Sequence, residues 1–275
     1  MVSTMAKQEA ALSRSALANR AEQRRLQQQK QQKQQLLIVG VVGLIVAAIF
    51  VVLILLVMQS NSTLPPAAVG NYAQLQQTMT EDGLPILGDP NAKVVVAEFA
   101  DFSCPHCRDY HPTIQQLIEK LVKTGQIRMM FVPQAFLAGN YSITAAKAAL
   151  CAQRQYTPRQ AGFWDMQDVL FNIQGTQTYT GFTTKNIADA AATAGLNLNA
   201  QSLGDCITGS DMNGILQRSS DLFNKYKLQG TPTMMYSTDG GQTFQFFTDS
   251  TGQPIAEGGP TYDILLANLN TLGVG

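Results

Sequence analysis

Hydrophobic residues form one uninterrupted run near the start of the chain. The 23 residues from Leu36 to Met58 include no charged side chain. At about 1.5 Å rise per residue, a helix of this length reaches roughly 34 Å, enough to cross a bilayer core of about 30 Å. The pattern therefore predicts a single transmembrane helix at 36–58. A buried soluble helix and a cleaved signal peptide are alternatives, but the run is longer than a signal-peptide core and no clear cleavage motif follows it.

Beyond residue 84 the apolar residues occur in short periodic groups. The segments 93–100 and 127–132 are apolar, short and bounded by turn residues, so each predicts a buried strand. Between them, apolar positions from Cys107 to Leu121 recur at steps of three and four, which predicts an amphipathic helix. A strand, a helix and a strand in this order indicate a parallel βαβ unit.

A long helical stretch at about 138–228 interrupts this α/β pattern. Its expected helices lie near 142–154, 161–173, 183–195 and 210–227. After it, Met234–Tyr236 and 242–247 predict two strands, and Asp239-Gly240-Gly241 predicts a hairpin turn between them. A last helix is expected at about 261–272. The predicted fold class is α/β, with one mixed sheet, helices on both faces and a helical insertion.

Charge divides the chain at the apolar run. Residues 1–35 carry seven Lys and Arg against two acids, and the remainder carries 12 basic against 17 acidic residues. By the positive-inside rule, the basic flank stays in the cytoplasm and the rest is exported. The predicted organisation is a Gln-rich tail at 1–35, an anchor at 36–58, a linker at 59–83 and an extracytoplasmic domain at 84–275. The formal net charge is zero, so no basic signature predicts a nucleic-acid partner.

All four cysteines follow the apolar run, and an even number in an exported domain favours disulfide chemistry. Cys104 and Cys107 form a Cys-Pro-His-Cys motif at the predicted start of a helix, where unpaired N–H groups stabilise the thiolate of the first cysteine. Pro105 suits the first helical position, and His106 adds a donor or a positive charge beside the sulfur. The motif predicts a low pKa for the Cys104 thiol and an oxidising disulfide.

Other uses of these cysteines are weaker. A zinc site would combine Cys104, Cys107 and His111, but the chain has no second cysteine pair at zinc-finger spacing. Covalent haem attachment needs a histidine directly after the second cysteine, where the chain has Arg108. His111 lies on the apolar stripe of the helix, so packing is favoured over a ligand role. No metal and no other cofactor is predicted.

Cys151 and Cys206 lie in the helical insertion, outside any C-x-x-C motif. A structural disulfide that joins two helices is the favoured interpretation, and two free buried thiols are the alternative. Such a bond would close a long loop, and in the chain-entropy model it would contribute on the order of 3–4 kcal/mol.

The segment Glu98–Cys107, EFADFSCPHC, resembles the active-site segment of DsbA-like thiol oxidoreductases. The resemblance is to the branch with a thioredoxin fold, an inserted helical domain and an N-terminal anchor. Gly88-Asp89-Pro90, Phe163-Trp164 and Gly230-Thr231-Pro232-Thr233 occur where that family has them, and the similarity spans about Leu84 to Leu272. It implies a thioredoxin-like fold, here preceded by a single transmembrane helix, and an enzyme that introduces disulfides into exported proteins.

The resemblance also implies a role for each site residue. Cys104 would be the exposed nucleophile that forms the mixed disulfide, and Cys107 the more buried resolving partner. Pro232 would be a cis-proline facing the disulfide, and the Thr231 backbone would pair with substrate. Glu98 would be a semi-buried carboxylate that manages protons near Cys107, the alternative being an ordinary strand residue facing solvent.

The partners follow from the same resemblance. Exported proteins with cysteine pairs would be the substrates, and a quinone-linked membrane protein of the DsbB or vitamin-K-epoxide-reductase type would be the reoxidant. Two alternative functions remain open. One is a reductase or isomerase that uses the same centre in the opposite direction, and the other is a non-catalytic module that binds a membrane partner. The reduction potential, which no residue spacing determines, separates the reductase from the oxidase.

Overall fold

The structure is a computed structural model in which one compact unit, Leu64–Gly275, carries the fold. The residues that it describes are Gly43, Tyr72, 75–156 and 162–274. The tail predicted at 1–35 lies outside them, and so does the transmembrane helix predicted at 36–58, apart from Gly43. Within the described residues, no helix is both long enough and apolar enough to span a bilayer.

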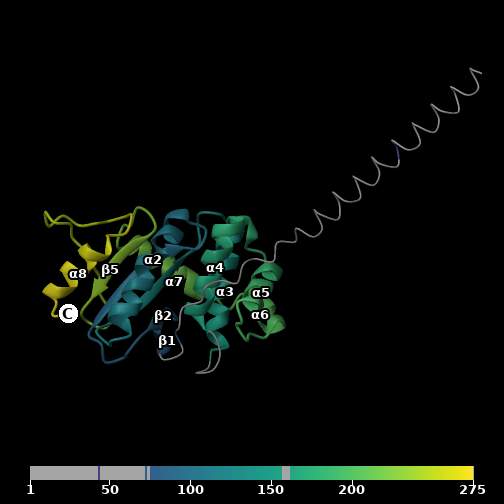
Figure 1. The fold of residues 1–275 in the computed structure, drawn as a ribbon, viewed down its shortest axis with the longest axis horizontal. Coiled ribbons are helices and arrows are strands. Elements are labelled where there is room, and N and C mark those ends of the chain that lie inside the picture. Colours follow the sequence, from purple (N-terminus) through teal and green to yellow (C-terminus); the bar gives the residue numbers. More distant parts are fainter. Residues whose placement is uncertain (1–42, 44–71, 73–74, 157–161, 275) are drawn as a thin grey trace, which may run out of the picture. The chain divides into compact units, whose positions relative to one another are not determined.

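A six-stranded mixed sheet forms the centre of this unit (Figure 1), with the strand order β1-β2-β4-β3-β5-β6. The strands are β1 (Gln77–Met79), β2 (Pro85–Leu87), β3 (Val94–Asp101), β4 (Ile127–Gln134), β5 (Thr233–Ser237) and β6 (Gln245–Phe246). Only β3 and β4 are parallel, with Val94 opposite Ile127 and Asp101 opposite Gln134. They form the predicted βαβ unit, because α2 (Pro105–Leu117) connects them.

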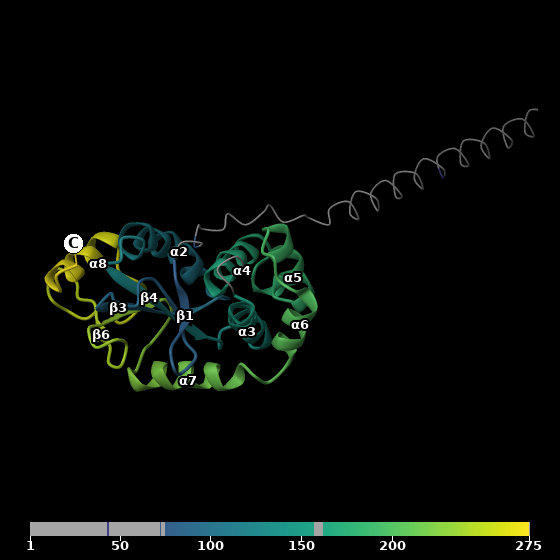
Figure 2. The ribbon, with the colours of Figure 1, turned by 90° about the horizontal axis from the view of Figure 1, so that it is seen from below.

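Helices cover both faces of the sheet (Figure 2). After α2 and the π-helical turn η1 (Ile118–Val122), the helices are α3 (Asn140–Arg154), α4 (Phe163–Gln177), η2 (Tyr179–Gly181), α5 (Thr184–Thr193), α6 (Ala200–Thr208), α7 (Asn213–Lys225) and α8 (Tyr262–Thr271). Helices α2 and α8 lie on one face and α7 on the other, while α3 to α6 gather beside the sheet. The thioredoxin-like order of elements and the helical insertion agree with the prediction.

Strand β3 is buried on both faces, and its alternation assigns each side chain to one of two cores. Val95 and Phe99 belong to the smaller core, under α7, whereas Val94 and Val96 belong to the larger core that α2, α4 and α8 cover. The side chain of Glu98 lies on the same face of the strand as those of Val94 and Val96. The strand therefore places a carboxylate among apolar side chains of the larger core.

The predicted start of the domain is wrong. The linker was predicted to extend to residue 83, but β1 (Gln77–Met79) pairs with β2, and Tyr72 is only 2% exposed. Gln77 and Thr78 are polar, and a three-residue edge strand has no apolar period to detect. The folded domain therefore begins before residue 84.

Within the insertion, the helices predicted at four places are found, and a fifth, α6 (Ala200–Thr208), was missed. It is nine residues long and contains Gly204 and Asp205, which are poor helix formers. The strand predicted at 242–247 is shorter than expected, since only Gln245–Phe246 pairs with β5. Tertiary packing, rather than local propensity, decides these short elements.

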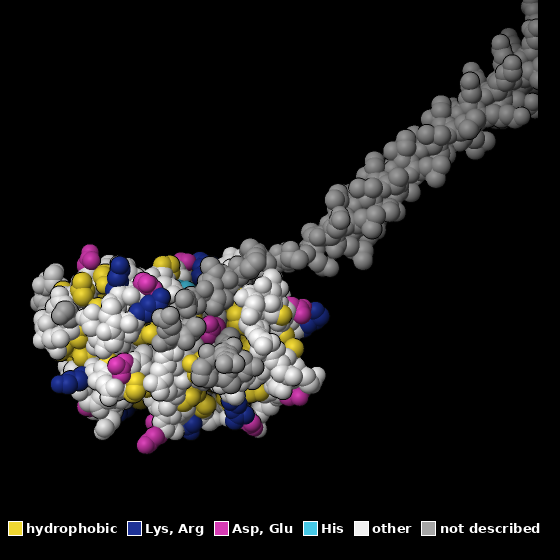
Figure 3. All heavy atoms as spheres, turned by 60° about the horizontal axis from the view of Figure 1, so that its bottom comes forward, with side chains coloured by type: hydrophobic (Ala, Val, Ile, Leu, Met, Phe, Trp, Pro, Cys, Tyr) yellow, Lys and Arg dark blue, Asp and Glu magenta, His cyan; other side chains and the backbone are white. Residues whose placement is uncertain are grey.

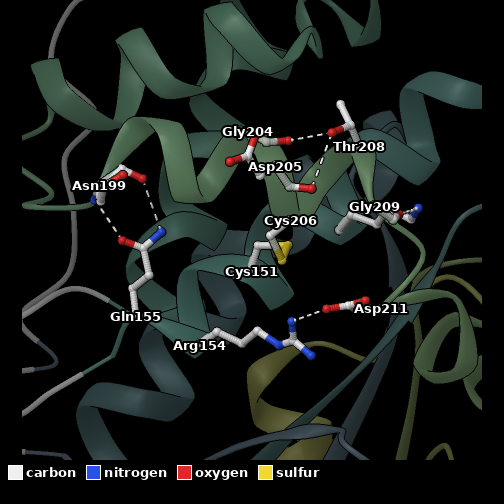
Figure 4. The surroundings of a disulfide bond; sticks show 11 residues. Cys151, Arg154, Gln155, Asn199, Gly204, Asp205, Cys206, Thr208, Gly209 and Asp211 are labelled. Carbon is white, nitrogen blue, oxygen red and sulfur yellow. Dashed lines mark hydrogen bonds and ion pairs between the residues drawn. A yellow bond between two sulfur atoms is a disulfide. The ribbon is translucent and has the colours of Figure 1, made fainter.

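A disulfide joins Cys151 on α3 to Cys206 on α6 (Figure 4), across 55 residues of sequence. Two side-chain links connect the same segments on either side of it, namely Gln155 with Asn199 and Arg154 with Asp211. The Arg154–Asp211 pair is half exposed, so its contribution is about 1 kcal/mol or less. The disulfide is therefore the strongest of these connections.

Charged side chains on the face drawn in Figure 3 are interspersed, with basic and acidic groups alternating over the described surface. Ion pairs such as Lys123–Glu119 and Lys185–Asp189 join neighbouring turns of single helices at the surface. Exposed pairs of this kind contribute about 0.3–0.5 kcal/mol each. The apolar cores, and not these pairs, hold the unit together.

Replacing Cys151 and Cys206 together with alanine is expected to lower the free energy of unfolding by about 2–4 kcal/mol, because the unfolded chain loses a cross-link. Denaturant unfolding without reductant measures the change. Wild-type protein in reductant is the control and should approach the double variant. Equal unfolding midpoints for the two proteins without reductant would contradict a stabilising role.

Candidate active site

Helix α2 begins directly after β3, and this junction carries the Cys-Pro-His-Cys motif. Cys104 is the N-cap residue, with an extended backbone, and Pro105 occupies the first helical turn, where its missing N–H is not needed. The Cys104 N–H donates to the Asp101 carbonyl at 2.9 Å, which closes the turn between strand and helix. The sulfur of Cys104 is therefore held at the positive end of the helix.

Asp101 shapes this turn, and the sequence did not single it out. Its carboxylate is fully buried and accepts hydrogen bonds from the N–H groups of Ser103, Phe136 and Leu137 at 2.8–3.0 Å. Burial raises the pKa of Asp101, and these N–H donors oppose the shift. Asp101 thus ties the motif to the loop after β4. An acid at the end of an otherwise apolar strand was the available signal.

Cys104 and Cys107 are both free in the structure, which therefore shows the dithiol form of the pair. Cys107 is fully buried, as the family resemblance implied. Cys104 is only 4% exposed, which corrects the expectation of an exposed nucleophile. Pro105 and His106, between them, are exposed. The exposed surface of the motif is therefore formed by Pro105 and His106, and little of it by the sulfurs.

The two thiols have opposite electrostatic environments. A hydrogen bond from the Cys107 thiol is the main cause that lowers the pKa of Cys104 from 9.0 to about 5. The Thr231 side chain and the backbone N–H groups of Cys107 and His106 lower it further, against the effect of burial. Burial raises the pKa of Cys107 far above its usual range, and the nearby Cys104 adds to that shift. At neutral pH one thiolate and one thiol therefore coexist.

The loop before β5 packs against Cys104. The Thr231–Pro232 peptide bond is cis, and the Thr231 carbonyl accepts a hydrogen bond from the Cys104 thiol at 3.3 Å. The Pro232 carbonyl accepts the Gly258 N–H at 3.0 Å, which fixes this loop to the next one. The structure thus brings Thr231 and Pro232, distant in sequence, to the cysteine pair.

A surface hollow of about 510 Å³ opens beside the pair. Its lining residues are His106, Asp109, Tyr110, Gly230, Thr231, Glu257 and Gly258. The Tyr110 hydroxyl donates to the Pro260 carbonyl at 2.7 Å, so helix α2 and the loop near Gly258 hold the walls in place. The hollow therefore lies next to the redox pair, between His106 of the motif and Thr231 of the loop before β5.

Glu98 lies on β3 and is fully buried. The solvent-facing alternative is therefore wrong, and Glu98 is more buried than the semi-buried carboxylate that was expected. One carboxylate oxygen accepts a hydrogen bond from Gln167 Nε2 at 3.4 Å. Burial raises the pKa of Glu98 from 4.5 to about 8, and the Gln167 hydrogen bond opposes the shift. The charge of Glu98 also raises the pKa of Cys107. A group with this pKa can take up or release a proton near neutral pH.

His111, one turn beyond Cys107, makes its contacts with α4 rather than with the two sulfur atoms. Its Nε2 lies 2.7 Å from an Asp168 carboxylate oxygen, and its ring packs on Phe171. Gln115 donates to the same Asp168 oxygen. Among the described residues, no group of three or more His, Cys, Asp and Glu is arranged to hold a metal ion.

The Cys104 thiol of the reduced protein is expected to titrate with a midpoint near pH 5, followed by the ultraviolet absorbance of the thiolate. Cys107→Ala is expected to raise that midpoint, because the Cys107 hydrogen bond is the largest cause of the shift. Cys104→Ser serves as the control and should lose the transition. A Cys104 midpoint near that of a free cysteine would contradict the site's electrostatics.

Comparison with known proteins agrees with this geometry. The family model described as thioredoxin matches residues 80–239, more than half of the chain. Disulfide bond formation protein D of Bacillus subtilis is 27% identical over 153 residues, which cover 55% of this chain and 67% of that protein. Thiol:disulfide interchange protein DsbA of Burkholderia cepacia is 28% identical over 149 residues, covering 53% of this chain and 64% of that protein.

Solved structures show the same fold. The oxidised crystal structure of BdbD from Bacillus subtilis superposes with a TM-score of 0.55 at 22% identity, covering 75% of this chain and 98% of that one. Chlamydia trachomatis DsbA superposes with a TM-score of 0.56 at 20% identity, covering 71% and 94%. The chain belongs to the thioredoxin family and is a DsbA-like thiol:disulfide oxidoreductase.

Proposed function

We propose that this chain introduces disulfides into exported proteins through its Cys-Pro-His-Cys dithiol/disulfide, in an extracytoplasmic compartment. The observation that carries the proposal is the asymmetry of the pair, in which the pKa of Cys104 is lowered to about 5 while that of Cys107 is raised. Stabilising the Cys104 thiolate stabilises the dithiol and makes the disulfide a stronger oxidant. The name of one relative, disulfide bond formation protein D, supports the same direction, and that of another, thiol:disulfide interchange protein, supports exchange chemistry at this pair.

The reaction is two successive exchanges. A substrate thiolate attacks Cys104 Sγ of the disulfide, and Cys107 leaves with the electron pair of the broken bond and takes up a proton. The second substrate cysteine, as a thiolate, then attacks the substrate sulfur of the mixed disulfide and releases Cys104 as a thiolate. The substrate loses two electrons and gains one disulfide, while the enzyme is left as the dithiol. The low pKa of Cys104 makes it a good leaving group in the second exchange.

The site residues divide this work. The Thr231 backbone lies beside Cys104, in a loop that the hydrogen bond from the Gly258 N–H to the Pro232 carbonyl holds in place, and it offers main-chain hydrogen bonds to an extended substrate. Pro105 starts the helix without an unused N–H, and the exposed His106 lies at the edge of the hollow. Glu98 supplies the proton that Cys107 takes up, which its raised pKa and its electrostatic effect on Cys107 support. No cofactor beyond the dithiol is needed for these steps.

Each turnover leaves the enzyme reduced, so an oxidant must restore the disulfide. We infer a quinone-linked membrane protein of the DsbB or vitamin-K-epoxide-reductase type. An anchor at 36–58, with the tail at 1–35 in the cytoplasm, would raise the concentration of the domain near such a partner. Release of the full-length chain from membranes by alkaline carbonate would contradict the anchor. Equal reoxidation of the dithiol with and without quinone-loaded membranes would contradict the partner.

Trapping tests the function. In the full-length Cys107→Ala variant, exported proteins with cysteine pairs are expected to accumulate as mixed disulfides on Cys104, because the sulfur that resolves an unproductive mixed disulfide is absent. Non-reducing electrophoresis followed by mass spectrometry detects them, and Cys104→Ser is the matched control that should trap none.

Two outcomes would overturn this assignment. A reduction potential near that of thioredoxin, about −270 mV, would favour a reductase. Unchanged disulfide formation in cells that carry Cys104→Ser would favour a non-catalytic module instead.

A further inference from the structure

The carboxylate of Glu98 is fully buried and has a single hydrogen-bond donor among the described residues. Gln167 Nε2, on α4, lies 3.4 Å from Glu98 Oε2, and both side chains are 0% exposed. Glu98 Oε1 and Gln167 Oε1 have no hydrogen-bond partner in the described part of the chain. Gln167 therefore provides the only direct polar contact found for the Glu98 carboxylate in the described part of the chain.

The groups around Glu98 supply no compensating positive charge. Its neighbours in the sheet are Phe131 on β4 and Met234 on β5, both apolar. The titratable groups that interact with it are Cys107 and Tyr110, both on α2, and the charge of Glu98 raises the pKa of each. No ion pair to Glu98 forms among the described residues. The ionised form of Glu98 therefore depends on the neutral amide of Gln167.

A neutral donor suits a group that must carry a proton in both directions. A buried carboxylate without a donor would hold its proton through every step, and one paired with a cation would stay ionised. An N–H donor favours the ionised form only moderately. With that donor, the pKa of Glu98 is raised to about 8 and not further, so both protonation states are accessible near neutral pH.

We propose that Gln167 is a positioning residue, which holds the Glu98 carboxylate and keeps it able to exchange a proton with Cys107. This inference rests on the proposed function, in which Cys107 leaves the disulfide with an electron pair. The carboxyl proton of Glu98 then passes to Cys107, leaving Glu98 as a carboxylate and Cys107 as a thiol. Reoxidation returns the proton from Cys107 to Glu98. The inserted helices would thus take part in the chemistry of the thioredoxin unit.

The test compares Gln167→Met, which keeps the size of the side chain and removes the donor, with the parent chain. Carbon-13 labelling of glutamate carboxyl groups is practical because the chain has six glutamates, and the spectrum of Glu98→Gln identifies the Glu98 signal. In the reduced full-length protein, Gln167→Met is expected to move the Glu98 midpoint upward by about one pH unit, since an ionised acceptor loses a hydrogen bond. The pH profile for oxidation of a reduced two-cysteine peptide should shift in the same direction.

Gln77→Met is the matched control, because Gln77 is also buried and also donates to a carboxylate, that of the half-buried Asp165. It should leave the Glu98 midpoint unchanged. In the Glu98→Gln background, Gln167→Met should have no further effect on the peptide reaction. An unmoved Glu98 midpoint, an equal shift in Gln77→Met, or an equal loss of rate with and without Glu98 would each overturn the proposal.

The test of Gln167 does not depend on whether Gln167→Met folds, because a second variant is available. Gln167 Oε1 has no described partner to leave unpaired, so an apolar replacement is expected to fold. Gln167→Leu gives a second apolar replacement should Gln167→Met not fold. The Glu98 titration can be measured without enzymatic turnover. A parent chain that fails to oxidise any two-cysteine peptide would contradict the proposed function, and the Glu98 midpoint would still decide the role of Gln167.

Discussion

The chemistry of this protein depends on stabilising one negative charge, the Cys104 thiolate, at a position that is nearly closed to water. Burial alone would raise the pKa of the thiol. The start of α2 reverses this because its free N–H groups and the Cys107 thiol point toward the sulfur. The strand-to-helix turn, the cis-Pro232 loop and the buried Asp101 all serve to keep that geometry. Without this strand-to-helix turn, burial would raise the pKa of Cys104, and the pair would behave as two ordinary buried cysteines.

The same burial creates a second problem, which the sheet solves. When the disulfide is reduced, Cys107 must gain a proton, yet it is fully enclosed. Because β3 is covered on both faces, the residue at position 98 is enclosed as well, and a glutamate there keeps its proton to higher pH than it would in water. Glu98, the proton carrier proposed above, and the Cys107 thiol are thus buried in one core. Burial raises the pKa of Glu98 to about 8, so that Glu98 can release a proton near neutral pH when Cys107 needs one.

Local patterns predicted the long elements and the redox pair, and they failed where tertiary contacts decide. Strand β3 and helix α2 follow from apolar runs and periodicity. Strand β1 does not, because Gln77 and Thr78 are polar and join the sheet only through β2. The limited exposure of Cys104 also escaped prediction, since it depends on the Pro232 loop more than a hundred residues away. The prediction that Thr231 and Pro232 lie beside Cys104 rested on the resemblance to a family, and no rule of spacing would have given it.

The inserted helices contact the surroundings of the redox pair through α4. The structural disulfide in the insertion therefore also affects the active site. Gln174 on α4 donates to the Ser103 carbonyl, and Gln167 on the same helix donates to Glu98. Helix α4 packs on α3, and α3 is joined to α6 through Cys151. A bond that limits movement of α3 therefore also limits movement of the helix that contacts the active site. Because a carboxylate–amide contact weakens steeply with distance and angle, a rigid insertion is a condition for a constant Glu98 pKa. The Cys151–Cys206 disulfide thus helps to fix the surroundings of the Cys104–Cys107 pair.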